Sequence, residues 1–316
     1  MAQHHERYAR TSRVAVPLFA IASLLGCGSS TDEAGSEDPT SQSVLEFRNA
    51  LEAGNYAATD ALMVDLDARV AADPDDGTAV LFAALARMWK LGEARRDPSF
   101  DLAKQAPIAL ESLQQFKRAR ELNPNDGRIQ AWIGFMTTRI GEAIGDSATI
   151  TQGTAELDAS LRDFETFTHF VRGITLLGRA HDDPVFASAP EDMWAVLESC
   201  GYEVDRQHID YAYPTGPLAP PAHICRDTSL AKHNWKGYFL HAGDVFSKAG
   251  DAATAKRFWE HARRSPTFDG WRYADVIEER IATAEERARL LTDEDPNNDP
   301  ELFAQSASVC VGCHAD

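Results

Sequence analysis

The sequence predicts an all-α protein, organised as an irregular α-solenoid in which helical hairpins stack on one another. From Ser43 onward, apolar residues recur with a helical period, and runs of alternating β-branched residues are almost absent. Glycines and prolines interrupt these periodic stretches and divide them into helices. The composition, with 44% hydrophobic and 25% charged residues over 316 positions, is that of a folded protein of one or two domains.

Residues 1–26 are expected to be a signal segment that does not belong to the fold. Arg7, Arg10 and Arg13 precede a short apolar run, VAVPLFAIASLLG, which is too short to span a bilayer comfortably. The run leads into LLGC, which resembles the lipobox of bacterial lipoproteins. The resemblance implies cleavage after residue 26 and lipidation of Cys27. The alternative is an ordinary signal peptide with a cysteine at its cleavage site.

Residues 27–42 are expected to be a flexible tether, because GSSTDEAGSEDPTSQ contains almost no apolar side chain. Gly28 follows Cys27, whereas an aspartate at that position is linked to inner-membrane retention in the lipoprotein family. The resemblance therefore implies a protein of the bacterial cell envelope, anchored by lipid at the periplasmic face of the outer membrane.

The chain is acidic. Its formal net charge is -18, and loss of residues 1–26 removes three arginines and one glutamate, which brings the charge to about -20. Such a surface repels phosphate, so we expect no nucleic-acid partner, whereas basic protein partners are compatible with it.

Residues 43–292 are predicted to form the helical domain. Its helices are predicted from the helical period of the apolar residues, and their ends from glycines and prolines. In chain order they are a hairpin over residues 43–76 that is broken at Gly54 and ends near Pro74, an insertion over residues 92–101, a helix over residues 106–126 that is stopped at Asn123-Pro124, an insertion over residues 140–154, a hairpin over residues 234–266 that is broken at Gly250 and ended by Pro266, and one helix over residues 271–291.

These hairpins resemble tetratricopeptide repeats, which place small residues where two helices cross, an aromatic residue in the second helix and a proline after it. The prolines at 74, 124 and 266 are not one repeat length apart. The resemblance therefore implies an irregular solenoid, and an unrelated helical bundle is the alternative. The matching positions are Gly243, Gly250, Ala255, Trp259, Ala262 and Pro266, then in part Phe116, Ala119 and Pro124, and more loosely Gly54, Tyr56 and Pro74.

The segment between Cys200 and Cys225 contains several prolines and tyrosines and is predicted to be a long loop rather than a helix. In an exported protein, two cysteines that bracket a loop favour a disulfide, which would stabilise the fold by about 3 kcal/mol. A metal site that uses both cysteines with His208 and His223 is the alternative, although its spacing matches no familiar zinc pattern.

The chain ends in CVGCHAD. Cysteines at positions i and i+3 share one side of a helical turn, so both thiols can reach the two vinyl groups of one porphyrin. Cys310, Cys313 and His314 resemble the haem-attachment motif of c-type cytochromes, over about the last twenty residues. The resemblance implies haem c bound covalently to Cys310 and Cys313, with His314 as the proximal iron ligand. A disulfide between the two cysteines and a partial metal site are the alternatives.

Only Ala315 and Asp316 follow His314, so upstream helices near Trp235 and Trp271 are expected to form at least one wall around the haem. The distal iron ligand stays open. By sequence distance the nearest candidates are His241, which is slightly preferred, and His233 and His261, and the more distant ones are Met63, Met88, Met136 and Met193.

Together these features predict a lipid-anchored, monohaem c-type cytochrome-like protein that transfers electrons and whose helical repeats dock a redox or envelope protein. An electron carrier is favoured over a bond-breaking enzyme. The chain has no glycine-rich phosphate loop, no Gly-x-Ser-x-Gly and no convincing nucleophile triad. The alternatives are an envelope scaffold with structural terminal cysteines, and an open-iron haem sensor or peroxidase.

Residues 293–316 are assigned to a linker and the haem-attachment tail. The acidic stretch DEDPNND, residues 293–299, could attract calcium through its carboxylate and amide oxygens. It lacks the glycine and the distal glutamate of an EF-hand loop, so a solvated linker is favoured.

Overall fold

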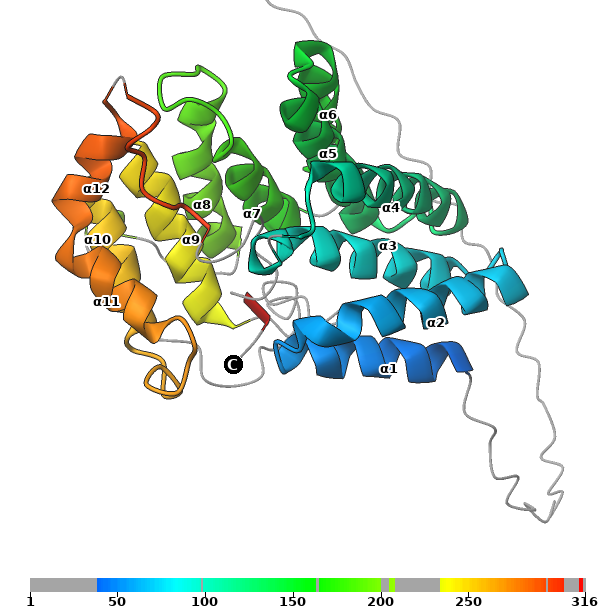
Figure 1. The fold of residues 1–316 in the computed structure, drawn as a ribbon. Helices are drawn as coiled ribbons and strands as arrows, with labels where there is room; N and C mark the ends of the chain where they lie inside the picture. Colours follow the sequence, from blue (N-terminus) through cyan, green and yellow to red (C-terminus); the bar gives the residue numbers. More distant parts are fainter. Residues whose placement is uncertain are drawn as a thin grey trace, which may run out of the picture. The chain divides into compact units, whose positions relative to one another are not determined.

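The computed structural model describes residues 39–97, 99–162, 165–199, 205–207, 234–293, 295–303 and 313–314. These residues belong to one compact unit, residues 37–316, and form helices, turns and loops but no strand (Figure 1). The all-α prediction is therefore confirmed. The helices are α1 (Pro39–Glu52), α2 (Thr59–Ala72), α3 (Gly77–Gly92), α4 (Leu102–Leu122), α5 (Gly127–Ile144), α6 (Ser147–Ser160), α7 (Glu165–Leu176), α8 (Ala189–Ser199), α9 (Trp235–Lys248), α10 (Ala252–Ala262), α11 (Ala274–Ala282) and α12 (Ala284–Leu291), with the 3₁₀ helices η1 (Tyr56–Ala58), η2 (Ala94–Arg96) and η3 (Phe186–Ser188).

Helices that follow one another in the chain pack on one another. Helix α3 packs between α2 and α4, α5 contacts α4, α6 and α7, and α9 contacts α8, α10 and α12 (Figure 1). This succession of neighbours is that of an α-solenoid, in which each pair of helices buries its apolar faces against the next. Among the described residues, no helix is both long and apolar enough to cross a membrane.

Aspartate and asparagine side chains mark the starts of many helices. Each accepts a hydrogen bond from a backbone N–H of the first turn, which would otherwise have no partner within the helix. The sequences DPDDG and NPNDG, residues 73–77 and 123–127, make similar connections, and the predicted helix ends beside Pro74 and Pro124 are confirmed. The capping residues are Asp76, Asp101, Asp126, Asp146, Asn234 and Asp251.

The predicted close crossing in the last hairpin is confirmed. Gly243 of α9 lies against the Trp259 indole of α10, and a Cβ on Gly243 would clash with that ring. The Trp259 Nε1–H donates to the carbonyl oxygen of Leu240 at 3.1 Å. The break at Gly250 is also confirmed, because its φ of 81° is left-handed, a conformation that favours glycine. Helix α10, however, ends at Ala262, before Pro266.

The predicted insertion over residues 140–154 is wrong. This stretch contains the end of α5, the start of α6 and the turn between them, and the two helices form a tight pair. Gly134 and Gly153 permit the close approach, because a Cβ on either would meet the facing helix. Gly145, with φ of 68°, ends α5, and Asp146 caps α6. Two helices therefore continue the stack here.

Residues 271–291 do not form the single helix that periodicity predicts. They contain α11 and α12, separated at Thr283, whose φ of -112° and ψ of 15° are not helical. The Thr283 hydroxyl donates to the carbonyl oxygen of Glu279 at 2.8 Å, a local bond that bends helices.

Helix α1 also begins earlier than expected, at Pro39, inside the segment predicted as a tether.

Candidate functional site

The terminal motif is attached to the start of α9 by a backbone hydrogen bond. Asn234 caps α9, because its Oδ1 accepts from the Gly237 N–H at 2.7 Å. The backbone N–H of Asn234 donates to the carbonyl oxygen of Cys313 at 2.6 Å. Cys313 is 3% exposed, and it forms a short helical turn with the partly buried His314 (Figure 1). The second half of the motif therefore lies against the helical domain.

The chain upstream of the motif also packs on the helical domain. Phe303 is buried, and the guanidinium of Arg139 lies over its ring, 5.4 Å from the ring centre. Glu301 forms an ion pair with Arg95 at 2.8 Å. Residues 295–303 and 313–314, called the tail below, thus connect α12 to side chains near the end of α3 and on α5.

Two buried arginines hold the tail by its main chain. Arg280 of α11 donates to the carbonyl oxygens of Glu301 and Leu302 at 3.2 and 3.1 Å. Arg287 of α12 donates to the Glu301 carbonyl oxygen at 2.6 Å. Sequence reasoning did not identify these arginines, since nothing in the helical pattern of residues 271–291 distinguishes a buried arginine from an exposed one. Asn234 could have been identified, because an asparagine directly before a helix is a typical cap.

His241, the preferred distal candidate, lies on α9 about two helical turns, or roughly 10 Å, beyond Asn234. It is 2% exposed, and its ring centre lies 6.3 Å from that of Phe303. Neither ring nitrogen has a hydrogen-bond partner among the described residues. Burial, with a smaller contribution from the charge of Arg280, lowers the pKa of His241 to about 3. The imidazole is therefore neutral near pH 7, and the neutral form is the one that binds metals.

A buried ion pair lies one helical turn further along α9. Asp244 accepts from Arg280 at 2.8 Å, and the two side chains are 0% and 2% exposed. Burial raises the pKa of Asp244 to about 7, although the charges of Arg280 and Arg287 oppose the rise. Because Arg280 bonds both Asp244 and the tail, the position of the tail depends on the interior of the helical domain.

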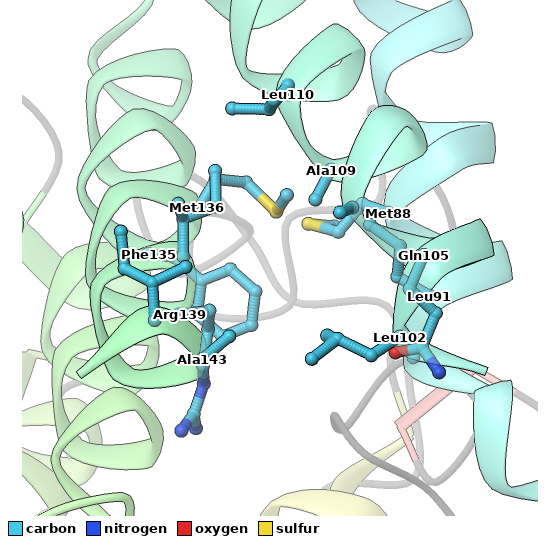
Figure 2. Close-up of a pocket in the computed structure, with 14 residues that line it drawn as sticks. Met88, Leu91, Leu102, Gln105, Ala109, Leu110, Phe135, Met136, Arg139 and Ala143 are labelled. Atoms are coloured by element: carbon cyan, nitrogen blue, oxygen red, sulfur yellow. The ribbon is translucent and has the colours of Figure 1, made fainter. Parts of the chain in front are cut away.

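The other candidate ligands lie in different parts of the fold. His261 of α10 is buried, with its ring centre 4.6 Å from that of Phe239. Met193 is buried in α8. Met88 and Met136 meet at an apolar cavity between α3, α4 and α5 (Figure 2). Met63 packs on the core from α2.

Several predicted site residues lie outside the described residues. Within the described ranges, no group of three or more histidines, cysteines and carboxylates is close enough to hold a metal ion. In the acidic stretch, Asp295 accepts hydrogen bonds from Asn297, and Asp293 accepts one from Asn298. These carboxylates therefore accept hydrogen bonds within local turns.

The predicted site residues that lie outside the described residues are Cys27, Cys200, His208, His223, Cys225, His233 and Cys310.

The described residues fit a covalently held haem in their chemistry. In such a site Cys313 would supply one thioether bond and His314 an imidazole ligand, and Trp235, next to Asn234, is buried, as expected for an apolar wall. His241 adds a buried imidazole whose two nitrogens have no hydrogen-bond partner within the described part of the chain. Trp271, the other expected wall residue, is buried beneath the ammonium group of Lys236, 5.6 Å from its ring centre.

No family model matches the chain, and neither the curated proteins nor the solved structures contain a significant match to it.

Proposed function

We propose that this chain is a lipid-anchored, monohaem c-type cytochrome-like protein that carries electrons and uses its helical domain to dock a protein partner. One observation supports the proposal most directly. The CVGCH motif contains Cys313, which Asn234 holds at the start of the same helix that bears the buried, neutral His241. The thiol and the adjacent imidazole match the attachment and ligand groups of a haem c site, and neither nitrogen of the His241 ring has a hydrogen-bond partner among the described residues.

Each residue has a distinct role in this proposal. Cys310 and Cys313 hold haem c through thioether bonds, and His314 is the proximal ligand, with His241 as the distal candidate. Haem bound in this way supplies reversible transfer of one electron. Trp235 contributes an apolar surface that excludes water.

The proposal places the protein in the bacterial cell envelope. Lipid on Cys27 anchors it to the membrane, at the periplasmic face of the outer membrane, and Cys200 and Cys225 form a disulfide there. Because the net charge is -18 before processing, a partner with a basic docking surface suits the helical domain. Electron transfer needs no nucleophile or general base, so we assign no catalytic residue.

The decisive experiment is expression of the full chain in a bacterium that has a haem-attachment system. Mass spectrometry of the purified protein should report lipid, covalent haem and the internal disulfide together, and a pyridine haemochrome spectrum should report haem c. Substitution of Cys310→Ala with Cys313→Ala should abolish the colour and the added mass. A colourless wild-type protein would overturn the redox proposal and leave an anchored helical scaffold.

The distal ligand can be tested separately. His241→Phe should convert a six-coordinate, low-spin spectrum to a high-spin one, whereas His261→Phe, a matched change at another buried histidine, should leave the spectrum unchanged. A low-spin spectrum that persists in His241→Phe excludes this residue as ligand. Rapid cyanide binding by a high-spin wild-type protein would instead support the open-iron sensor or peroxidase.

A further inference from the structure

An apolar cavity of about 480 Å³ lies between α3, α4 and α5 (Figure 2). Pockets that hold small organic ligands have volumes of this order. The thioether groups of Met88 and Met136 face each other across it (Figure 2). Methionine side chains are flexible and polarisable, so they adapt to apolar ligands of irregular shape. Among the described residues, neither Cys313, His314 nor His241 lines this cavity.

The rim of the cavity exposes large aliphatic side chains. Leu102, Leu110 and Ile144 are 59%, 52% and 67% exposed, and all three line the cavity. Three other large apolar side chains of the described residues are exposed, Leu45, Val64 and Val185, and none of them lines it. Exposed apolar side chains gathered at one cavity are typical of a binding groove, because only an occupant removes them from water.

The lining identifies the chemical class of the occupant. Phe135 is the only aromatic residue among the described residues of the lining, and most of the rest are alanine, leucine, isoleucine and methionine. Stacking walls for a flat aromatic ligand are therefore absent from this part of the chain. An aliphatic wall with two mobile methionines fits a flexible alkyl chain.

Of the described residues that line the cavity, only one is charged, and it is cationic. Arg139 lies at the end of the cavity away from Leu110 (Figure 2), and no carboxylate belongs to the described lining. Its guanidinium donates to Glu142 at 2.8 Å and to the Ile174 carbonyl oxygen at 3.2 Å, but its buried Nε–H has no hydrogen-bond partner among the described residues. The charge at this end therefore suits an anionic head group, with which Glu142 would compete.

We propose that the cavity between α3, α4 and α5 binds an alkyl monocarboxylic acid about as long as laurate, with the alkyl chain between Met88 and Met136 and the carboxylate at Arg139. This inference does not depend on haem, since it uses none of the residues assigned to haem attachment. It adds a binding activity for fatty acids to a protein proposed to carry electrons.

Titration of the full, matured protein with laurate tests the proposal. The protein is purified without detergent and stripped of bound lipid, and binding is measured by calorimetry and by native mass spectrometry. One laurate should bind per chain. Ala109→Phe places a ring in the cavity and should weaken binding by roughly tenfold or more. Ala103→Phe, the same change at an exposed position of α4 outside the cavity, should leave the affinity unchanged.

The head group is tested with Glu142→Gln. This change removes the carboxylate that competes for Arg139, so it should strengthen binding of laurate but not of dodecanol. Equal binding of both ligands, unaffected by Glu142→Gln, would overturn the contact with Arg139.

Failure of laurate to bind, or wild-type affinity in Ala109→Phe, would overturn the whole proposal. If Ala109→Phe does not fold, Ala106→Trp provides the same test from the exposed rim. If laurate does not bind and Ala109→Phe instead dissociates a dimer, the cavity is a contact between copies of the chain and the proposal is wrong. Absence of haem, by contrast, would leave laurate binding unchanged.

Discussion

Substitution of Gly243→Ala should destabilise the pair of helices that carries the candidate haem site. The added Cβ would clash with three atoms of the Trp259 indole, which is fully buried. Because the clash involves a ring inside a packed core, α9 and α10 must move apart or Trp259 must turn. Either movement breaks the hydrogen bond from the Trp259 Nε1–H to the carbonyl oxygen of Leu240.

The size of the effect follows from three contributions. Overpacking a core costs about 1–3 kcal/mol. A buried indole N–H without a partner costs about 1–3 kcal/mol. Alanine is favoured over glycine within a helix by about 1 kcal/mol, which offsets part of the loss. Together they lower the free energy of unfolding of Gly243→Ala by about 1–5 kcal/mol, with a midpoint of about 3 kcal/mol.

Urea unfolding followed by circular dichroism measures the loss, and hydrogen exchange of α9 and α10 locates it. Gly270→Ala is the matched control, because nothing lies within 4 Å of a Cβ at that exposed position, and its effect should be below about 0.5 kcal/mol. Combining Gly243→Ala with Trp259→Phe should recover at least about 1 kcal/mol relative to the sum of the single changes. A loss below about 0.5 kcal/mol in Gly243→Ala, or strict additivity in the double variant, would refute the close crossing.

Three further changes test other contacts. Arg280→Met leaves Asp244 buried without its ion-pair partner, so it should lower the free energy of unfolding by about 3–5 kcal/mol. The change also removes a donor to the Leu302 carbonyl, so hydrogen exchange in residues 295–303 should become faster. Unchanged exchange in these residues would contradict the role of Arg280 in holding the tail. The pKa of His241 is about 3 in the folded chain, whereas its ordinary value, taken for the unfolded chain, is 6.5. As the pH falls below about 6.5, the unfolded chain therefore gains a proton at His241 that the folded chain does not, and the free energy of unfolding decreases. His241→Leu removes this loss. In urea unfolding of haem-free protein, its free energy of unfolding relative to wild type should rise by about 1.4 kcal/mol for each pH unit between about pH 6 and 4. A difference that does not vary with pH would contradict the low pKa of His241. Asp126→Ala removes the cap of α5 and should cost about 1 kcal/mol in the same assay; wild-type stability would show that the cap contributes little.

The parts of the fold that the sequence predicted depend on local chemistry. Proline ends a helix wherever it occurs, and glycine permits a left-handed turn, so the boundaries near Pro74, Pro124 and Gly250 follow from neighbouring residues alone. The crossing of Gly243 and Trp259 was also predictable, because it repeats the spacing of a known helical hairpin.

The parts that the sequence did not predict depend on contacts between distant residues. Helix α3 is missing from the predicted elements, although residues 79–86 are all apolar and such a run is typical of a helix that is buried on nearly all sides. Arg280 reaches Asp244 and Leu302, which lie 36 and 22 residues away. Of the candidate site, the residue types of the motif, His241 as a candidate ligand and the cap at Asn234 could be predicted from the sequence. The docking of Cys313 on Asn234 required the fold.

The tail is held largely by its peptide groups. Asn234, Arg280 and Arg287 all bond to carbonyl oxygens of the tail, which every amino acid carries. Replacement of side chains at Leu302 or Cys313 therefore leaves these anchors in place. Substitutions along the tail can therefore change the chemistry that this end of the molecule displays, while the polypeptide follows the same path.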